Sequence, residues 1–167
     1  MKTTKRVILY PLLGIMFCAH TVRYTLRRLF GVKGTSDGVR VICIHRGRIV
    51  LVRHWYVPDV WTLPGGGVSK KETIEETAKR EVQEETGFRV NSFGGELGTY
   101  QGRMGAKDTV TVLFTEDLKG GLKLLPTFEI MERGLFDLDR LPKTLSPANR
   151  KRIEAYKSGV QRERGAW

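Results

Sequence analysis

Residues 66–88 read GGVSKKETIEETAKREVQEETGF, a glycine-rich turn followed by a strongly patterned segment. Thr73 and Glu76 have the spacing of a Thr-x-x-Glu capping box, which is typical of the start of a helix. Apolar residues then recur every four positions, at Ile74, Ala78 and Val82. Gly87 suits the left-handed conformation in which many helices end. The stretch therefore predicts a helix that begins after Thr73 and ends at Gly87.

Three glutamates gather on one side of this predicted helix. Glu81, Glu84 and Glu85 are spaced i, i+3 and i+4, so their side chains project within an arc of about 100°. Arg80 alone does not balance three carboxylates, whereas a hard divalent cation takes oxygen ligands together with substrate phosphates. A solvated acidic face is the alternative. The Pro-Gly-Gly-Gly loop before the helix argues against it, because such a loop lets the backbone approach a ligand closely.

The same stretch resembles the Nudix box, whose pattern is G-x5-E-x7-R-E-U-x-E-E-x-G-U, with U a bulky apolar residue. The fixed positions are all filled in this chain, by Gly66, Glu72, Arg80, Glu81, Glu84, Glu85 and Gly87. Phe88 places an aromatic side chain where the pattern has an aliphatic one. A chance match at seven specified residues is improbable by many orders of magnitude, so the resemblance is specific.

The resemblance continues outside the box. The lead-in Trp61–Gly67 and the later stretch Glu129–Pro142 look like the corresponding parts of MutT-like Nudix domains. The similarity thus covers about residues 38–157. It implies a Nudix-type α/β/α sandwich in which a mixed sheet is covered on both faces. An extra N-terminal helix is expected from the pattern of the residues that precede it, outside the resemblance.

The remaining sequence patterns agree with an α/β architecture. Two β-branched runs flank a turn at Arg46–Gly47 and predict a hairpin, namely Val39–Ile44 and Ile49–His54. Further strand-like segments cover about residues 89–101, 108–117 and 128–137. Ser146 and Pro147 have the pattern of an N-cap and a first helical residue, and they open a basic C-terminal helix.

Nudix enzymes hydrolyse a nucleoside diphosphate linked to another moiety, by attack of water on phosphorus with the help of a divalent metal. The resemblance therefore implies a pyrophosphohydrolase that uses Mg²⁺, with Mn²⁺ able to substitute. It implies four metal ligands, namely Glu81, Glu84, Glu85 and the Gly65 carbonyl. Arg80 would orient the carboxylates through charge-assisted hydrogen bonds, and Glu72 would act through water or loop contacts.

The general base and the substrate contacts have several candidates. The helix glutamates Glu84 and Glu85 are candidates for the base, as are the later residues Glu129 and Glu132. Glu129 is also a candidate metal ligand, although it equally suits an exposed strand position. Arg53 and His54 stand at the end of a strand that approaches the site, and either contact phosphate or face water. Three aromatic residues either stack on a base or pack within the protein, namely Trp55, Tyr56 and Trp61.

The net charge of +11 is concentrated at the two ends of the chain. Residues 1–36 hold seven basic residues and no acidic one, and residues 140–167 hold eight basic and two acidic. The body between them carries a charge of −2. An RNA 5′-end pyrophosphohydrolase, held on the phosphate backbone by these ends, is one alternative function, but no RNA-binding motif favours nucleic acid. A non-catalytic nucleotide-binding Nudix module is the other alternative, and the intact box argues against it.

Residues 1–36 are predicted to be a basic amphipathic helical segment, followed by a Nudix hydrolase domain over residues 37–167. The apolar run Val7–Ala19 is too short to span a bilayer and is not followed by a small-x-small cleavage site. The pattern beyond it is amphipathic, with Cys18, Val22, Leu26 and Leu29 on one face. Three alternatives follow: a helix packed on its own domain, peripheral contact with an anionic membrane through residues 7–30, and a signal or anchor segment.

Composition limits the class of protein and its compartment. The 167 residues are 40% hydrophobic and 28% charged, which excludes wholesale disorder and a multi-pass membrane protein. The two cysteines, Cys18 and Cys43, lie in apolar stretches and are predicted to be buried rather than paired or metal-bound. A cytoplasmic protein with a nucleotide-type substrate is expected, and no oligomeric state is predicted.

Overall fold

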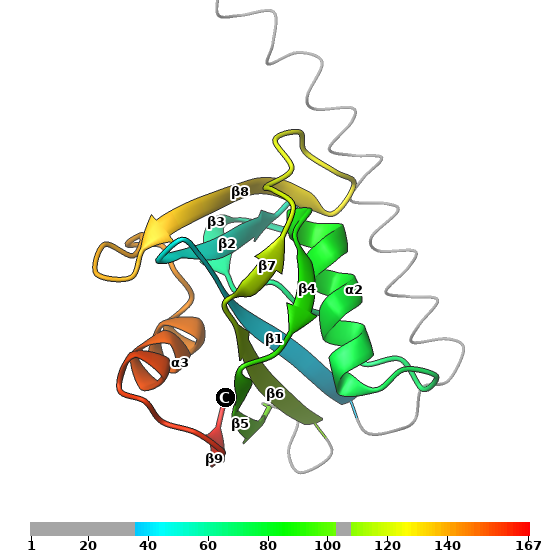
Figure 1. Ribbon diagram of the computed structural model, residues 1–167, viewed down its shortest axis with the longest axis vertical. Coiled ribbons are helices and arrows are strands. Elements are labelled where there is room, and N and C mark those ends of the chain that lie inside the picture. The colour runs from blue at the N-terminus through cyan, green and yellow to red at the C-terminus, as the bar shows by residue number, and fades with distance from the viewer. Residues whose placement is uncertain (1–35, 103–107) are drawn as a thin grey trace, which may run out of the picture.

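The computed structural model describes residues 36–102 and 108–167, and in this part of the chain two helices cover a mixed β-sheet (Figure 1). The elements in chain order are β1 (Ser36–His45), β2 (Arg48–His54), β3 (Val57–Thr62), α2 (Ile74–Thr86), β4 (Arg89–Ser92), β5 (Gly95–Gln101), β6 (Asp108–Thr115), β7 (Asp117–Lys119), β8 (Ile130–Asp137), α3 (Pro147–Lys157) and β9 (Glu163–Ala166). The predicted α/β architecture with a mixed sheet is confirmed.

Strand β1 connects the two halves of the sheet. It pairs in parallel with β6 along most of its length and antiparallel with β2 next to the hairpin turn. The strand order is β3-β2-β1-β6-β5-β9, with β8 also paired to β2, and β4 and β7 form a separate two-stranded sheet. Arg46 and Gly47 have φ angles of 51° and 74°. Positive φ at both positions is the geometry of a tight two-residue hairpin, so the predicted turn is confirmed.

Two helix predictions are confirmed, one strand prediction needs correction, and one strand was missed. Pro147 occupies the first turn of α3 after Ser146, as expected, although the Ser146 side chain makes no capping hydrogen bond. The segment 89–101 is two strands in different sheets, and the backbone between them passes through Gly94 and Gly95, where the Phe114 ring lies too close to Gly94 for a Cβ atom. Strand β9 was not predicted, and it pairs in parallel with β5.

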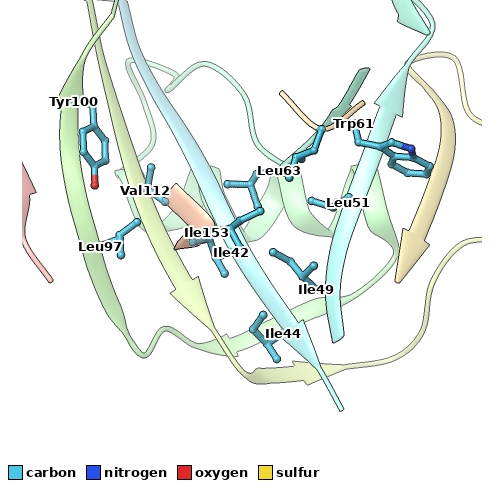
Figure 2. Close-up of a cluster of buried hydrophobic side chains, with 11 residues drawn as sticks. Ile42, Ile44, Ile49, Leu51, Trp61, Leu63, Leu97, Tyr100, Val112 and Ile153 are labelled. Atoms are coloured by element: carbon cyan, nitrogen blue, oxygen red, sulfur yellow. The ribbon is translucent and has the colours of Figure 1, made fainter. Parts of the chain in front are cut away.

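Each helix packs on its own hydrophobic layer of the sheet. Side chains along β1 alternate between the two faces, so Val39, Val41 and Cys43 join α2, and Ile42 and Ile44 join α3. Figure 2 shows the α3-side cluster, in which strand residues of β1 and β2 meet the helix residue Ile153. The two helices thus cover both faces of the sheet. On the part of β1 that is not paired with β2, the glycine loop hydrogen-bonds to the strand.

Some predictions concern residues outside the described part. The N-terminal helical segment, its three alternatives and the burial of Cys18 fall in residues 1–35. Cys43 is buried without a disulfide, as predicted, and burial raises the pKa of its thiol. Over residues 36–102 and 108–167, neither helix is long and apolar enough to cross a membrane.

Candidate active site

The register of α2 is fixed by both of its ends. The Thr73 hydroxyl accepts a hydrogen bond from the Glu76 backbone N–H at 3.2 Å, and the Glu76 carboxylate accepts one from the Thr73 backbone N–H at 2.8 Å. At the other end Gly87 has φ 94° and donates its N–H to the Gln83 carbonyl at 3.1 Å. The predicted capping box and glycine end are therefore confirmed, and they set the direction in which the three glutamates project.

The three glutamates differ sharply in their exposure. The Glu85 side chain is 4% exposed and the Glu81 side chain 11%, whereas the Glu84 side chain is 57% exposed. Glu85 points under the glycine loop, where its Oε2 accepts the Gly65 backbone N–H at 2.9 Å. The acidic stripe is therefore not a solvated helix face, because two of its three carboxylates are turned towards the sheet.

The glycine loop is held between β1 and these carboxylates. Val39 donates its N–H to the Gly66 carbonyl and Val41 donates to the Pro64 carbonyl, each at 2.9 Å. A Cβ atom on Gly65, where φ is 141°, would lie 2.1 Å from the Val39 carbonyl oxygen. A Cβ atom on Gly66 would lie 2.5 Å from Glu81 Oε1. Gly65 must be glycine because its backbone passes so close to that of β1, whereas a side chain at residue 66 would displace the Glu81 carboxylate.

Arg80 organises the outer part of the acidic group. Its Nε and Nη2 donate to the two carboxylate oxygens of Glu72, at 2.9 and 3.0 Å. Its Nη1 donates to Glu81 at 2.8 Å and lies 3.4 Å from the Glu84 carboxylate. The hydrogen bonds from Arg80 lower the pKa of Glu72. The geometry fits the orienting role that the resemblance implies for Arg80.

A second group of possible metal ligands surrounds Glu85. His54, Glu85 and Glu129 each offer one ligand atom, and these atoms lie within 4.8 Å of one another. The pKa of Glu85 is raised to about 8, chiefly by burial and in part by the nearby charges of Glu81 and Glu129, against the opposing effects of Arg40 and the Gly65 N–H. Carboxylates and a carbonyl are the oxygen ligands that Mg²⁺ and Mn²⁺ prefer, so the residues present fit a hard divalent cation.

Three residues predicted near the site lie in a separate cluster. Arg53 pairs with the Glu132 carboxylate and donates to the Pro58 carbonyl at 3.1 Å. Its guanidinium lies 4.7 Å from the centre of the Trp61 ring, and that ring is 6% exposed and packs edge-on against Phe136. Arg53 is paired across the sheet with Trp61, whereas the next residue, His54, lies after a shift in the strand register and reaches Glu85 at 3.8 Å.

The other two aromatic candidates lie next to the site. Trp55 donates its indole N–H to the Thr127 carbonyl at 2.9 Å and its backbone N–H to the Glu129 carbonyl at 3.2 Å. These bonds hold the segment that carries Glu129 against the end of β2. Tyr56 is 41% exposed, and its ring lies 4.9 Å from that of His54. Desolvation of its hydroxyl raises the pKa of Tyr56 to about 12.

Arg40 was not among the residues predicted for the site. This β1 residue donates from Nη1 to the Gly65 carbonyl and lies 3.5 Å from the Leu63 carbonyl. Its charge lowers the pKa of Glu85 against the effect of burial. The sequence contained an indication that Arg40 is unusual, since it is the one charged residue within the apolar run of residues 39–44.

The fold and the site agree with the comparisons to known proteins. Residues 34–156 match the family described as NUDIX domain, so the chain belongs to the NUDIX family and is a hydrolase of phosphoric anhydride bonds. A solved MutT NUDIX hydrolase from Burkholderia pseudomallei is similar, with a TM-score of 0.63 and 26% identity over 72% of this chain and 96% of that one.

Two curated relatives have named activities. A Bacillus subtilis (strain 168) protein named "Putative 8-oxo-dGTP diphosphatase" is 33% identical over 127 residues, which are 75% of this chain and 83% of the relative. A Methanocaldococcus jannaschii protein named "ADP-ribose pyrophosphatase" is 38% identical over 102 residues, which are 58% of each chain. Both are proteins to which this chain is similar, and both are named for nucleotide substrates.

Proposed function

We propose that this protein is a divalent-metal-dependent pyrophosphohydrolase that cleaves a nucleoside diphosphate linked to another moiety into a nucleoside monophosphate and a phosphorylated remainder. The observation that supports it most is the buried Glu85 carboxylate, which lies beside the carboxylates of Glu81 and Glu129. Such a concentration of negative charge is unfavourable without a cation. It is useful in a site that must bring a cation to an anionic pyrophosphate.

Each residue of the site has a proposed task. Glu81, Glu84, Glu85 and the Gly65 carbonyl would hold the ion, which when bound neutralises charge on the pyrophosphate and acidifies water. Arg80 keeps the Glu81 carboxylate in place, and Glu72 in turn holds the Arg80 guanidinium with two hydrogen bonds. Tyr56 is exposed enough to contact a nucleotide base, whereas the buried ring of Trp61 is not.

Among the later acidic residues, Glu129 rather than Glu132 is proposed to act in catalysis. Glu129 lies within the group that includes Glu85 and His54, whereas Glu132 is paired with Arg53 in the adjacent cluster. Glu129 therefore has the position from which a general base could take a proton from the attacking water. Glu129→Gln is expected to lower kcat strongly and to change KM less.

The substrate is proposed to be a small nucleotide that contains a pyrophosphate. The names of the two relatives, for 8-oxo-dGTP and for ADP-ribose, support this class without selecting a member of it. RNA with a 5′-triphosphate contains the same bond, so it belongs in the same test. Cytoplasmic location, and peripheral membrane contact through residues 7–30, stay predictions.

A substrate panel tests the proposal. Purified protein is incubated with nucleoside triphosphates including 8-oxo-dGTP, with ADP-ribose and nucleoside diphosphate sugars, and with 5′-triphosphorylated RNA, each with Mg²⁺, Mn²⁺ or EDTA. We expect release of a nucleoside monophosphate from at least one small nucleotide, dependent on the metal. A preference for the RNA that falls steeply with salt would support the RNA alternative instead, and hydrolysis of none of them would contradict the proposed function.

A pair of variants tests the site itself. Glu85→Gln is expected to lose most turnover while its thermal unfolding shows an intact fold. Glu75→Gln removes an exposed carboxylate from the same helix and serves as the matched control, with turnover close to that of wild type. Equal rates for wild type and Glu85→Gln would show that the site has been placed wrongly.

A further inference from the structure

Arg40 occupies an unusual position for an arginine. It lies in the central strand β1, and the residues on either side of it, Val39 and Val41, are buried in the α2-side core. Alternation along the strand directs Arg40 to the other face, which β1 otherwise fills with apolar side chains such as Ile42. Placing a charge there costs free energy unless the charge has partners, so the contacts of the guanidinium identify its role.

The Arg40 guanidinium contacts the glycine loop. Arg40 Nη1 donates to the Gly65 carbonyl and lies near the Leu63 carbonyl. Two backbone hydrogen bonds, from Val39 to Gly66 and from Val41 to Pro64, hold the loop on either side of Gly65. The Gly65 carbonyl therefore cannot turn away from β1 without breaking them, and of the two groups the long Arg40 side chain is the one that can move.

The guanidinium and the Glu85 carboxylate contact the same residue of the loop, because Arg40 donates to the Gly65 carbonyl and Glu85 accepts the Gly65 N–H at 2.9 Å. Against the effect of burial, the positive charge of Arg40 also lowers the pKa of Glu85 and of Tyr56. A divalent ion bound to Glu85 and to the same carbonyl would have the Arg40 guanidinium as its neighbour on that oxygen, and the two positive charges would repel each other. Metal binding therefore favours departure of Arg40 from the Gly65 carbonyl.

We propose that the Arg40 guanidinium provides the positive charge of the metal-free site. When metal binds, Arg40 leaves the Gly65 carbonyl and contacts the pyrophosphate of the substrate instead. This inference rests on the proposed function and assigns Arg40 as a phosphate contact of that site. A guanidinium suits the task because its planar set of donors matches phosphate oxygens in pairs. The attachment of Arg40 to β1 keeps the released side chain beside the bound metal.

Two binding measurements without turnover test the proposal on the full chain. The first is Mn²⁺ affinity in the absence of substrate, from the electron paramagnetic resonance signal of free Mn²⁺. The second is the affinity for inorganic pyrophosphate at saturating Mg²⁺, from calorimetry. Both are measured for wild type, Arg40→Gln and Arg40→Lys, with Arg48→Gln as a control that removes an exposed positive charge from β2.

The two affinities are expected to change in opposite directions. Arg40→Gln removes a competitor of the metal, so Mn²⁺ should bind about tenfold more tightly. It also removes a phosphate contact, so pyrophosphate should bind about tenfold more weakly. Arg40→Lys keeps the charge without the planar fork and should fall between wild type and Arg40→Gln in both, which preserves the test if Arg40→Gln does not fold. Arg48→Gln should change neither affinity by more than about twofold.

The opposite signs separate this role from a structural one, because a merely damaged site would lose both affinities. Unchanged or weaker Mn²⁺ binding by the Arg40 variants overturns the proposal, and so does unchanged pyrophosphate binding. If wild type binds Mn²⁺ and hydrolyses a substrate, these outcomes overturn the role of Arg40 alone. A wild-type protein that binds no Mn²⁺ overturns the proposed function together with it.

Discussion

Helices α2 and α3 cover opposite faces of one sheet, and each buries charge in a different way. On α3, Arg152 is 1% exposed, yet its guanidinium stacks 3.6 Å from the centre of the Tyr100 ring, lies 3.5 Å from the Glu163 carboxylate and donates to the Ala166 carbonyl. On α2, Glu85 is 3% exposed, and the charges of Glu81 and Glu129 lie beside it.

The comparison separates a structural charge from a functional one. The charge of Arg152 is met by groups of the protein itself, and its contacts attach β9 and the end of the chain to α3. The Glu85 carboxylate faces Arg40, the Gly65 N–H and, at 3.8 Å, the His54 imidazole, but the like charges of Glu81 and Glu129 oppose them. A buried charge with unlike neighbours is balanced within the fold itself, whereas a buried charge with like neighbours points to a ligand that completes it.

The largest effect is expected where the loop touches α2. In Gly66→Ala the new methyl group would lie 2.5 Å from Glu81 Oε1, which is the movable end of a side chain. The Glu81 carboxylate should therefore swing away while the fold survives, and we expect metal affinity and kcat to fall about 10- to 100-fold. Gly121→Ala, where a Cβ meets nothing within 4 Å, is the control and should leave both unchanged. A Gly66→Ala enzyme as active as wild type would show that the position of Glu81 does not matter.

The α3 side should respond in stability rather than in activity. Arg152→Met replaces the buried guanidinium with an apolar chain and removes its contacts with Tyr100, Glu163 and Ala166. We expect a loss of about 2–3 kcal/mol in the free energy of unfolding, measured in urea with EDTA present, because Glu163 stays partly exposed. Lys151→Met, one residue earlier and exposed, should cost little. If Arg152→Met lowers kcat of the folded enzyme, the division between the two helices is wrong.

The buried Glu85 carboxylate on α2 should also make the stability of the metal-free protein depend on pH. Because the pKa of Glu85 is raised from 4.5 to about 8, the folded state retains a proton that the unfolded chain releases. Stability from this group is complete below about pH 4.5 and is lost as the pH rises through 8.

In EDTA, the Tm of wild type should fall between pH 5.5 and 8.5 by several degrees more than that of Glu85→Gln. Added Mg²⁺ should restore the Tm of wild type at pH 8.5 and not that of the variant. Parallel pH profiles would contradict the raised pKa of Glu85.

The smallest effect concerns the first turns of the two helices. Thr73 caps α2 through its side chain, whereas Ser146 precedes α3 without such a hydrogen bond. Thr73→Ala should therefore cost about 1 kcal/mol of unfolding free energy, and Ser146→Ala less than about 0.5 kcal/mol. Thermal unfolding of the two variants measures the difference. Equal losses would mean that the capping box does not set the start of α2.

The sequence predicted the α2 half of the molecule in more detail than the β5–β9 edge. The capping box, the apolar spacing and Gly87 are local signals, so the residues of α2 are enough to place both ends of the helix. The division of residues 89–101 into β4 and β5 depends on Phe114, which comes from a distant strand, and β9 pairs with β5 only after α3 has crossed the sheet. Interactions between segments far apart in the chain leave no periodic trace in either segment.

The same distinction holds within the site. The three helix glutamates follow from spacing alone, but their unequal burial depends on where the glycine loop lies. His54 was a candidate phosphate contact and Glu129 a candidate base or metal ligand, but their approach to Glu85 depends on the pairing of β2 with β8 and on the hydrogen bonds from Trp55. Trp61 was a candidate for base stacking, and its burial against Phe136 removes it from the site.

Titration of Mn²⁺ into wild type and Glu85→Gln, without substrate, tests most directly whether the buried charge on α2 exists to hold a metal. Wild type should bind the ion, and Glu85→Gln should bind it about 100-fold more weakly with its fold intact, because the amide removes the charge of the most buried carboxylate. Arg152→Met should bind Mn²⁺ as wild type does. Equal Mn²⁺ affinity in wild type and Glu85→Gln, or no binding by wild type, would contradict the assignment of Glu85 as a metal ligand.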